Sequence, residues 1–328
     1  MKALITGGAG FIGAHLAEHL VEKGFGVDVV DDFSRGTHDE AIASLEASGR
    51  VRLLERDLRP PGALEDCDSD YDYIVHLAAV VGVANVVARP SDVLRDNISM
   101  LQEVTSLAHR QSSLRRFLFA STSEVYAGTL ENFTLPMPTP ETAPLALPDL
   151  ARPRTTYMLS KIYGEAIVRH AGVPFTIVRP HNVYGPRMGL AHVIPELLQR
   201  AHASSDGRLD VFSVHHRRTF CYVDDAVEFL VRAVETPQSE GQTLNVGSQR
   251  PEVSIGELAD IVISVVGKDL KVVSREATPG SPERRCPDMT KTIRLTNYEP
   301  QVSLDEGVRR TYEAYRTRVF EPAAAVSS

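Results

Sequence analysis

The chain has no tryptophan, few cysteines and no long apolar run. Its three cysteines, Cys67, Cys221 and Cys286, are widely separated, so we expect reduced thiols and neither a disulfide framework nor a metal site. No apolar run reaches about 18 residues, so a transmembrane helix is not predicted. The N-terminus reaches glycines too early for a signal peptide, and a cytoplasmic location is therefore expected.

An excess of positive charge is also missing. Lysine and arginine number 35 against 43 acidic residues, and the formal net charge is −8. This balance argues against a protein that binds nucleic acid through its overall charge. The 328 residues are 43% hydrophobic, which is enough to bury a substantial core and corresponds to about two domains.

Short apolar runs alternate with amphipathic stretches along the chain. Residues 3–5 form an apolar run, a helical stripe with period four follows over 12–20, and 27–30 is apolar again. This β-α-β order predicts an α/β protein with a doubly wound parallel sheet of the Rossmann type. Further strands are predicted at 51–54, 73–77, 117–120, 175–178 and 243–246, and helices at 92–109, 157–170, 193–202 and 255–266.

The pattern changes after residue 180, where proline and glycine become frequent. We expect residues 1–180 to form a cofactor-binding domain to which 214–246 returns. A smaller α/β substrate lobe is expected from 181–213 and 247–320, and 321–328 should fray. Residues 135–153 contain six prolines and are predicted to be a loop.

Three glycines, Gly7, Gly10 and Gly13, follow the first predicted strand and open the first predicted helix. Gly7 would permit a tight turn, Gly10 would let backbone N–H groups approach a pyrophosphate, and Gly13 would allow close helix packing. Asp31 ends the second predicted strand, where its carboxylate would bind the adenosine ribose and repel a 2′-phosphate. The pattern therefore predicts binding of NAD in preference to NADP.

Tyr157 and Lys161 have the spacing that places two side chains on one face of a helix. A phenol with a pKa near 10 is a poor base at neutral pH. A neighbouring ammonium and an oxidised nicotinamide would favour the phenolate, so Tyr157 is a candidate catalytic base.

Thr122, Ser123 and Glu124 follow the predicted strand 117–120. Ligands of open parallel sheets bind at the carboxyl ends of strands, so these side chains are candidates for contacts with a sugar hydroxyl and for proton transfer. The alternative is a helix N-cap in which Glu124 completes a capping box.

The chain resembles the extended short-chain dehydrogenase/reductase family of nucleotide-sugar epimerases, dehydratases and decarboxylases. The resemblance extends over nearly the whole chain. It is carried by TGGAGFIG (6–13), VDDFS (30–34), RDL (56–58), HLAA (76–79), STSEVY (121–126), YMLSK (157–161), RPHNVYGPR (179–187), RRTFCYVDD (217–225) and PERRCPD (282–288).

The resemblance implies a tightly bound NAD, regenerated at each turnover, a nucleotide-sugar substrate, no metal, and a homodimer formed through helices near 92–109 and 157–170. The implied catalytic residues are Thr122, Ser123, Glu124, Tyr157 and Lys161. The implied cofactor contacts are Gly7, Gly10, Phe11, Ile12, Gly13, Asp31, Asp32, Phe33, Ser34, Asp57, Leu58, Leu77, Ala78, Ala79, Asn97, Tyr157, Lys161 and Pro180. The implied substrate contacts are Gly82, Val83, Thr122, Ser123, Asn182, Arg187, Arg218 and Arg285.

The motifs do not select one branch of the family. Ser123 replaces an acid typical of 4,6-dehydratases, whereas Thr122-Ser123-Glu124 and Arg154 resemble UDP-glucuronate decarboxylases. Residues 76–83 and 157–165 resemble UDP-glucuronate 4-epimerases. The 4-epimerase is favoured, with Arg187 as a candidate partner of the substrate carboxylate; the alternatives are a decarboxylase, a 4-epimerase of a neutral UDP-hexose and a 4,6-dehydratase. His181 departs from the family pattern, in which phenylalanine is common at this position.

Overall fold

A computed structural model describes residues 1–277 and 280–321, without the side chain of Val83. Seven parallel strands form the main sheet in the order β11-β6-β5-β4-β1-β2-β3. This order confirms the predicted doubly wound α/β fold. The predicted fraying over 321–328 lies, apart from Glu321, outside the described residues. The strands of the main sheet are β1 (Lys2–Thr6), β2 (Gly26–Asp31), β3 (Val51–Glu55), β4 (Tyr73–His76), β5 (Arg116–Ala120), β6 (Phe175–Pro180) and β11 (Gln242–Val246).

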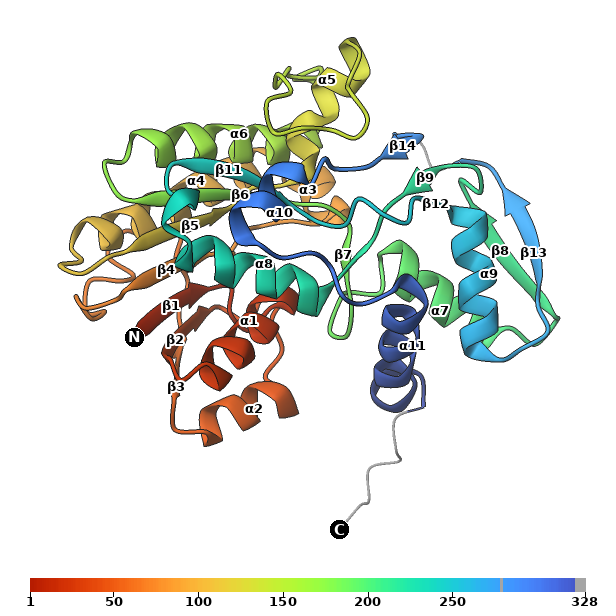
Figure 1. Ribbon diagram of the computed structural model, residues 1–328, viewed down its shortest axis with the longest axis horizontal. Helices are drawn as coiled ribbons and strands as arrows, with labels where there is room; N and C mark the ends of the chain where they lie inside the picture. The colour runs from red at the N-terminus through yellow and green to blue at the C-terminus, as the bar shows by residue number, and fades with distance from the viewer. Residues whose placement is uncertain (278–279, 322–328) are drawn as a thin grey trace.

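Helices cover both faces of this sheet (Figure 1). The helices α4 and α6 pack on each other on one face, and α1, α2 and α8 lie on the other. Burial on both faces explains why the central strands are continuous apolar runs and do not alternate with polar residues. The helices around the sheet are α1 (Phe11–Glu22), α2 (Glu40–Ala47), α3 (Val83–Ala88), α4 (Pro90–His109), α6 (Thr155–His170), α8 (Val223–Glu235) and α10 (Thr290–Thr296).

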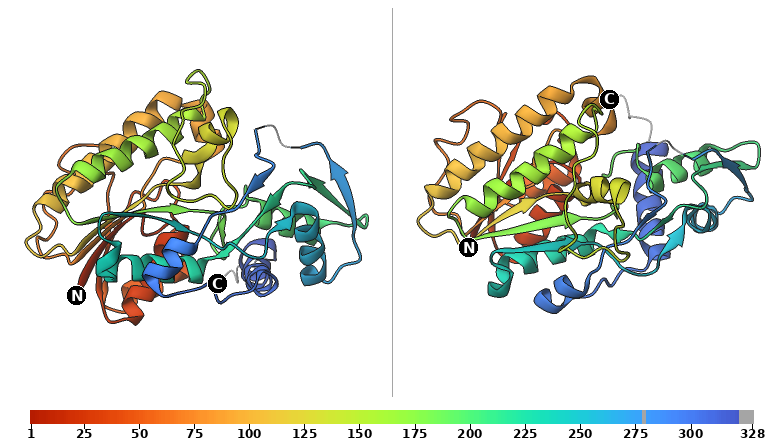
Figure 2. Two further views of the ribbon diagram at one scale, coloured as in Figure 1. Left: turned by 45° about the horizontal axis from the view of Figure 1, so that its top comes forward. Right: turned by 90° about the horizontal axis from the view of Figure 1, so that it is seen from above.

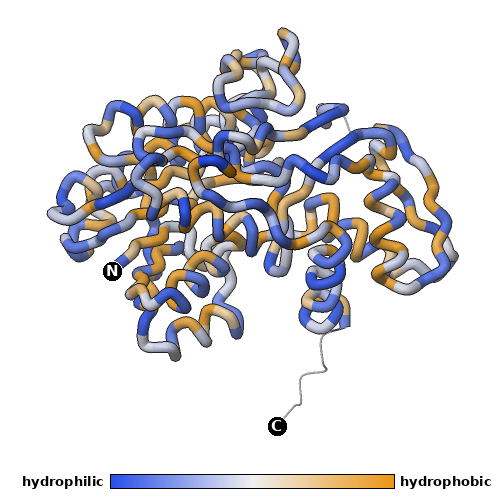
Figure 3. The backbone as a smooth tube through the Cα atoms, in the orientation of Figure 1, coloured by the Kyte–Doolittle hydropathy of each residue, from blue (hydrophilic) through white to orange (hydrophobic). Residues whose placement is uncertain are grey.

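Two buried clusters hold these layers together. Leu101, Val104 and Val168 fill the space between the sheet and the α4–α6 pair, and Leu16 and Phe229 belong to the cluster on the opposite side. The strands of the main sheet are correspondingly hydrophobic along most of their length (Figure 3). At about 25 cal/mol per Å² of apolar surface, this burial is the main source of stability.

The order of the central strands places a crevice beside β1. The strand β1 lies between β2 and β4, so the chain leaves β1 toward one edge and β4 toward the other. Ligands of doubly wound sheets bind at this reversal, beyond the carboxyl ends of the strands. The glycine-rich turn after β1 and the segments after β4 and β5 therefore face a common site.

A smaller lobe lies beside the sheet (Figures 1 and 2). The strand β8 pairs with β13, and β9 lies between β12 and β14. After forming most of the lobe, the chain returns to the main sheet, where α10 packs on α8 and β11. The remaining elements are β7 (Val183–Tyr184), α7 (Val193–Ala203), β8 (Arg208–Phe212), β9 (Arg217–Arg218), β10 (Cys221–Tyr222), η2 (Pro237–Ser239), β12 (Val253–Ser254), α9 (Ile255–Val266), β13 (Lys271–Arg275), β14 (Arg284–Arg285), α11 (Leu304–Tyr315) and η3 (Arg316–Phe320).

The segment between β5 and α6 projects above the sheet (Figure 1). It begins with the turn η1 (Ser123–Tyr126) and the helix α5 (Ala127–Asn132). No helix or strand of the described chain lies within residues 135–153, as the prolines there predict. Within this segment, α5 packs closely on the proline-rich loop at Gly128 and Ala146. A Cβ at Gly128 would lie only 1.9 Å from the carbonyl oxygen of Ala146. Among the described helices, none has the length and apolar character needed to cross a membrane.

Candidate active site

The glycine-rich turn has the geometry expected of an anion site. Gly7 has a φ of +71°, and a Cβ at Gly13 would lie 2.2 Å from the carbonyl oxygen of Gly7. The N-terminus of α1 has no side-chain cap at Gly10, and no acidic residue lies in its first turn. Its N–H groups, including those of Phe11 and Ile12, can therefore bind the pyrophosphate of a dinucleotide.

Asp31 joins this turn to the end of β2. Its carboxylate accepts hydrogen bonds from the backbone N–H of Ala9 at 3.0 Å and of Phe33 at 2.9 Å. Burial raises the pKa of Asp31, and these two N–H groups oppose that shift. Asp32 accepts bonds from the backbone and hydroxyl of Ser34, so residues 31–34 form one compact turn beside the glycines.

The segment after β4 is anchored to both neighbouring elements. The backbone of Leu77 donates to Thr6, and the backbone of Ala78 lies against Gly7. The side chain of Asn97 bonds both backbone groups of Val80 and the hydroxyl of Ser160. These bonds hold residues 77–80, which include Ala79, at the edge of the crevice beside α6.

Two neighbouring residues that the resemblance assigns to the cofactor, Asp57 and Leu58, differ in their surroundings. Leu58 is buried in the cluster between the sheet and the α4–α6 pair. The carboxylate of Asp57 accepts hydrogen bonds from the backbone and side chain of Arg59, and the guanidinium holds the pKa of Asp57 below its usual range.

Tyr157 and Lys161 lie on one face of α6, as their spacing predicts. The ammonium of Lys161 donates to the carbonyl of Ala120 at 2.8 Å and lies 6.0 Å from the centroid of the Tyr157 ring. Burial lowers the pKa of Lys161 to about 8. Burial and the charge of Glu124 raise the pKa of Tyr157, and the hydroxyl of Thr122 partly opposes that rise. Tyr157 is therefore protonated at neutral pH unless further positive charge lies beside it.

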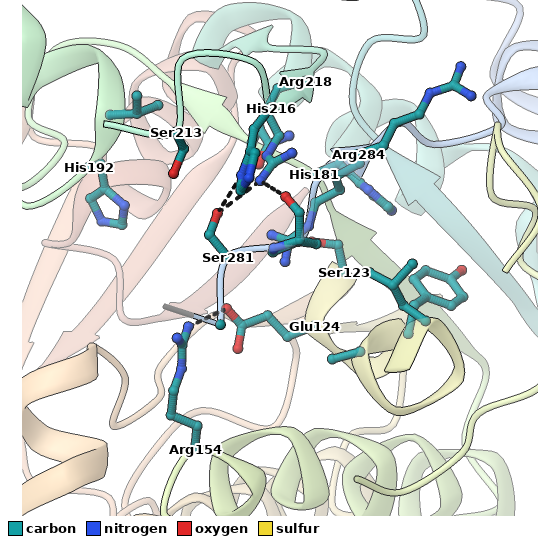
Figure 4. Close-up of a pocket in the computed structure, with 18 of the residues that line it drawn as sticks. Ser123, Glu124, Arg154, His181, His192, Ser213, His216, Arg218, Ser281 and Arg284 are labelled. Atoms are coloured by element: carbon teal, nitrogen blue, oxygen red, sulfur yellow. Dashed lines mark hydrogen bonds and ion pairs between the residues drawn. The ribbon is translucent and has the colours of Figure 1, made fainter. Parts of the chain in front are cut away.

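The carboxyl end of β5 brings three predicted residues to this pair. The hydroxyl of Thr122 accepts the backbone N–H of Glu124 at 3.2 Å and caps the turn η1. Thr122 both caps the turn η1 and contacts Tyr157. The two interpretations of Thr122 from the sequence, a helix cap and a residue of the site, are therefore compatible. Glu124 extends toward Arg154, 3.9 Å away (Figure 4).

A cavity of about 1340 Å³ opens between this end of the sheet and the lobe. Ser123 and Glu124 line it from β5, and Asn182 and His181 line it from β6. Its charged lining is mainly basic (Figure 4). The basic side chains are Arg152, Arg154, Arg200, Arg218, Arg284 and Arg285.

Three of the substrate contacts implied by the resemblance, Asn182, Arg218 and Arg285, line this cavity. The amide of Asn182 donates to the carbonyl of Thr219, and Arg218 donates to the hydroxyl of Ser281 at 3.1 Å. Burial and the charge of Arg285 lower the pKa of Arg218 to about 10. The guanidinium of Arg285 has no hydrogen bond or ion pair with any described residue, so its donors are available to an anion.

Arg187 lies elsewhere. Its guanidinium pairs with Asp39 and donates to the carbonyl of Ala9 at 2.8 Å, which ties the loop after β7 to the glycine-rich turn. It does not line the cavity, and its backbone has a φ of +69°. Gly82 precedes α3 as its N-cap and Val83 is its first residue; among the described side chains of that helix, only Val87 lines the cavity. We therefore omit Arg187 from the proposed substrate ligands.

Two buried groups at the site were missed by the sequence analysis. Glu165 accepts bidentate hydrogen bonds from Arg179 at 2.8 and 2.7 Å, and joins α6 to β6. Asn245, at the end of β11, bonds Tyr126 and His181. Asn245 lies near the carboxyl end of the predicted strand 243–246. This position was the one feature of the sequence that could have indicated a role at the site. No cluster of three potential metal ligands occurs among the described residues.

Comparisons with known proteins agree with this geometry. Residues 3–247 match the family described as "NAD dependent epimerase/dehydratase family". The chain is 31% identical over 327 residues to UDP-N-acetyl-alpha-D-glucosaminuronate decarboxylase of Bacillus cytotoxicus, covering 96% of this chain and 98% of the relative. It is 31% identical to UDP-glucuronic acid decarboxylase 1 of Arabidopsis thaliana, covering 98% of this chain and 71% of that protein.

Solved structures give the same result for the fold. UDP-glucuronic acid 4-epimerase from Bacillus cereus, in complex with UDP-glucuronic acid and NAD, superposes with a TM-score of 0.80 at 27% identity, covering 96% of this chain and 99% of that one. UDP-glucose 4-epimerase from Thermotoga maritima has a TM-score of 0.81 at 29% identity, covering 96% and 99%. The chain is therefore an enzyme of the NAD-dependent epimerase/dehydratase family.

Proposed function

We propose that this enzyme decarboxylates a UDP-hexuronate after oxidising its C4 hydroxyl. The observation that carries the proposal is Glu124, an acidic side chain that lines the cavity and whose charge acts on Tyr157. The chain is also similar over nearly its whole length to decarboxylases. This assignment changes the preference of the sequence analysis, which favoured the 4-epimerase.

Tyr157 is the proposed base for the C4 hydroxyl proton. NAD, when bound, accepts the hydride from C4 and later returns it. Lys161 would supply positive charge beside Tyr157 and the cofactor ribose, while Thr122 bonds the phenol and lowers its pKa. Removal of the proton and hydride from the substrate converts the C4 alcohol to a ketone.

The ketone makes the substrate a β-keto acid, which readily loses CO₂. A carboxylate bound near Glu124 is destabilised by like charge, and loss of CO₂ relieves this repulsion by moving the negative charge from the carboxylate to the C4 oxygen of the enolate. The enolate that remains takes a proton from water at C5. Return of the hydride to C4 and of the Tyr157 proton to the C4 oxygen completes the conversion to a UDP-pentose. Glu124 therefore favours decarboxylation over retention of the carboxylate.

The lobe would hold the nucleotide diphosphate. Arg218 and Arg285 present guanidinium groups to the cavity, and Asn182 lies between them and the sheet. Guanidinium is suited to a diphosphate because it donates two parallel hydrogen bonds. We propose that residues 1–180 and 214–246 serve mainly the cofactor, and 181–213 and 247–320 mainly the substrate.

A 4-epimerase of UDP-glucuronate is the second candidate. Such an enzyme must let the oxidised sugar turn over inside the site. The cavity, at about 1340 Å³, exceeds the usual 300–1,000 Å³ of small-molecule sites and leaves room for that rotation. The loop at 80–83 also resembles that of epimerases.

The product decides between the two. UDP-glucuronate carrying ¹³C at C6 should yield labelled CO₂ and a UDP-pentose in an NMR time course. UDP-galacturonate that retains the label would instead establish the epimerase. Glu124→Gln should lower CO₂ release about 10²-fold or more, within the range expected for proton-transfer and electrostatic groups. Glu131→Gln is the matched control, because Glu131 also lines the cavity but pairs with Arg152 on the projecting segment.

We also propose that the enzyme is a homodimer formed through α4 and α6. These helices pack on each other at the surface of the sheet, and Tyr163 on α6 is 48% exposed. Sedimentation at several protein concentrations tests this, and a monomer at all of them would contradict it.

A further inference from the structure

His181 is a buried histidine in the wall of the cavity. Its side chain follows β6 and is 2% exposed, and it lies beside the ring of Tyr126 with the centroids 6.0 Å apart. Figure 4 shows it among the residues that surround the cavity, near Ser123. The charge of Arg285 acts on His181, and the charge of Glu124 acts on Arg285. His181 therefore lies near the end of the cavity that contains Glu124.

The hydrogen bonds of Asn245 determine which ring nitrogen of His181 carries the proton. The Asn245 Nδ2 donates to the carbonyls of Thr139 at 3.0 Å and Asp288 at 3.1 Å. Its Oδ1 therefore faces His181 Nε2, 3.0 Å away, and it also accepts the Tyr126 hydroxyl at 3.1 Å. Since Oδ1 is an acceptor, Nε2 must donate and carries the proton.

The other nitrogen, Nδ1, is buried and has no hydrogen-bond partner among the described residues. Burial and the charges of Arg285 and Arg179 lower the pKa of His181 to about 3, so the ring stays neutral at physiological pH. Nδ1 is therefore a lone-pair acceptor. Buried polar atoms almost always have partners, and one that lacks a protein partner beside a cavity is suited to a ligand.

We propose that His181 is a specificity-determining residue whose Nδ1 accepts a hydrogen bond from an O–H or N–H group on the sugar of the substrate. The inference rests on the proposed function only in taking a UDP-sugar as the ligand. A site with a buried acceptor discriminates against sugars that lack the donor, because the acceptor is then left unpaired. Phenylalanine, common at this position in the family, could not make this distinction.

Two substitutions separate the ring nitrogens. His181→Gln keeps an amide near the position of Nε2, which can still bond Asn245, but removes the Nδ1 acceptor. His181→Asn keeps a polar atom near the position of Nδ1. Both are made in NAD-loaded Tyr157→Phe protein so that ligands are not consumed, and affinities for UDP, UDP-glucuronate and UDP-N-acetylglucosamine are measured by calorimetry.

In the Gln variant, we expect UDP-sugar affinity to fall about 5- to 10-fold, the size of one neutral hydrogen bond, with UDP affinity unchanged. The Asn variant should stay within about threefold of the parent. A loss for both sugars indicates a shared hydroxyl donor, and a loss for the acetamido sugar alone indicates its N–H. An equal loss for UDP would mean that His181 merely positions Arg285, and this or the absence of any loss overturns the proposal.

A measurement on the unsubstituted His181 ring tests the proposal even if a variant does not fold. The ¹⁵N resonance of His181 Nδ1 should move on addition of a UDP-sugar and stay in place on addition of UDP. An Nδ1 resonance that does not respond to the sugar would refute the proposal. Because these readouts are of binding, a wrong reaction product would count against the proposed function and leave this inference standing.

Discussion

The pair Glu165–Arg179 should be a main determinant of stability near the site. Both side chains are at most 5% exposed, and Glu165 accepts three hydrogen bonds, two from Arg179 and one from Ser121 at 2.7 Å. The pair joins α6, which carries Tyr157 and Lys161, to β6. Glu165→Gln removes the countercharge while leaving a side chain of the same size.

The expected cost follows from burial. Breaking a buried ion pair by removing one partner costs about 3–5 kcal/mol, because the remaining charge is left uncompensated. At about 2–4 °C per kcal/mol, the scaling for domains of 150–250 residues, the melting temperature should fall by about 6–20 °C. Burial lowers and the Glu165 carboxylate raises the pKa of Arg179, with a net rise. Guanidinium is intrinsically so basic that Arg179 should stay charged when this partner is lost.

Thermal unfolding followed by circular dichroism is the assay. The matched control is Glu313→Gln, which breaks an exposed pair with Arg309 and should cost no more than about 1 kcal/mol. The double variant Glu165→Leu with Arg179→Met should recover part of the loss, because an apolar pair needs no countercharge. A Glu165→Gln protein that melts within about 4 °C of the parent, as the control should, would refute the reasoning.

Further predictions concern the chemistry. Tyr157→Phe should fold and bind NAD but lose turnover by about 10²-fold or more, and near-normal turnover would exclude Tyr157 as the base. Turnover should fall as pH rises above about 8, where Lys161 loses its charge, and Lys161→Arg should move this limb to higher pH because guanidinium stays protonated. A pH profile identical in both proteins would contradict that role. The cofactor-free enzyme should bind NAD more tightly than NADP, and Asp31→Asn should bring the two dissociation constants closer together; an unchanged ratio of these constants would count against Asp31 as the residue that selects NAD.

Much of the fold could be predicted because its signals are local. The main-sheet strands were predicted to within two residues, and the predicted helices 92–109 and 157–170 begin two residues earlier, at Pro90 and Thr155. The helices α2, α3, α5, α10 and α11 and the pair β8–β13 are among the elements that were not predicted. Helices of six to eight residues such as α2 and α5 contain too few turns for a clear apolar period.

The residues of the site were predicted less completely than the elements of the fold. Asp225 illustrates the limit, because the residues next to it in the sequence do not indicate its hydrogen-bond partners. The carboxylate of Asp225 is buried and accepts hydrogen bonds from the backbone of Gln301 and Val302 and the hydroxyl of Tyr298, which are more than 70 positions away. Arg187 shows the same limit, since its partner Asp39 lies in another part of the chain.

The sequence by itself determined the alternating elements, the glycine-rich turn and the shared helix face of Tyr157 and Lys161, because each depends on residues within a few positions of one another. Tertiary structure decided what Glu124 and Arg285 face, where Arg187 lies and which nitrogen of His181 is free. These properties depend on burial and on partners from distant strands, and neither charge pairing nor the protonation of a buried ring is encoded by local spacing.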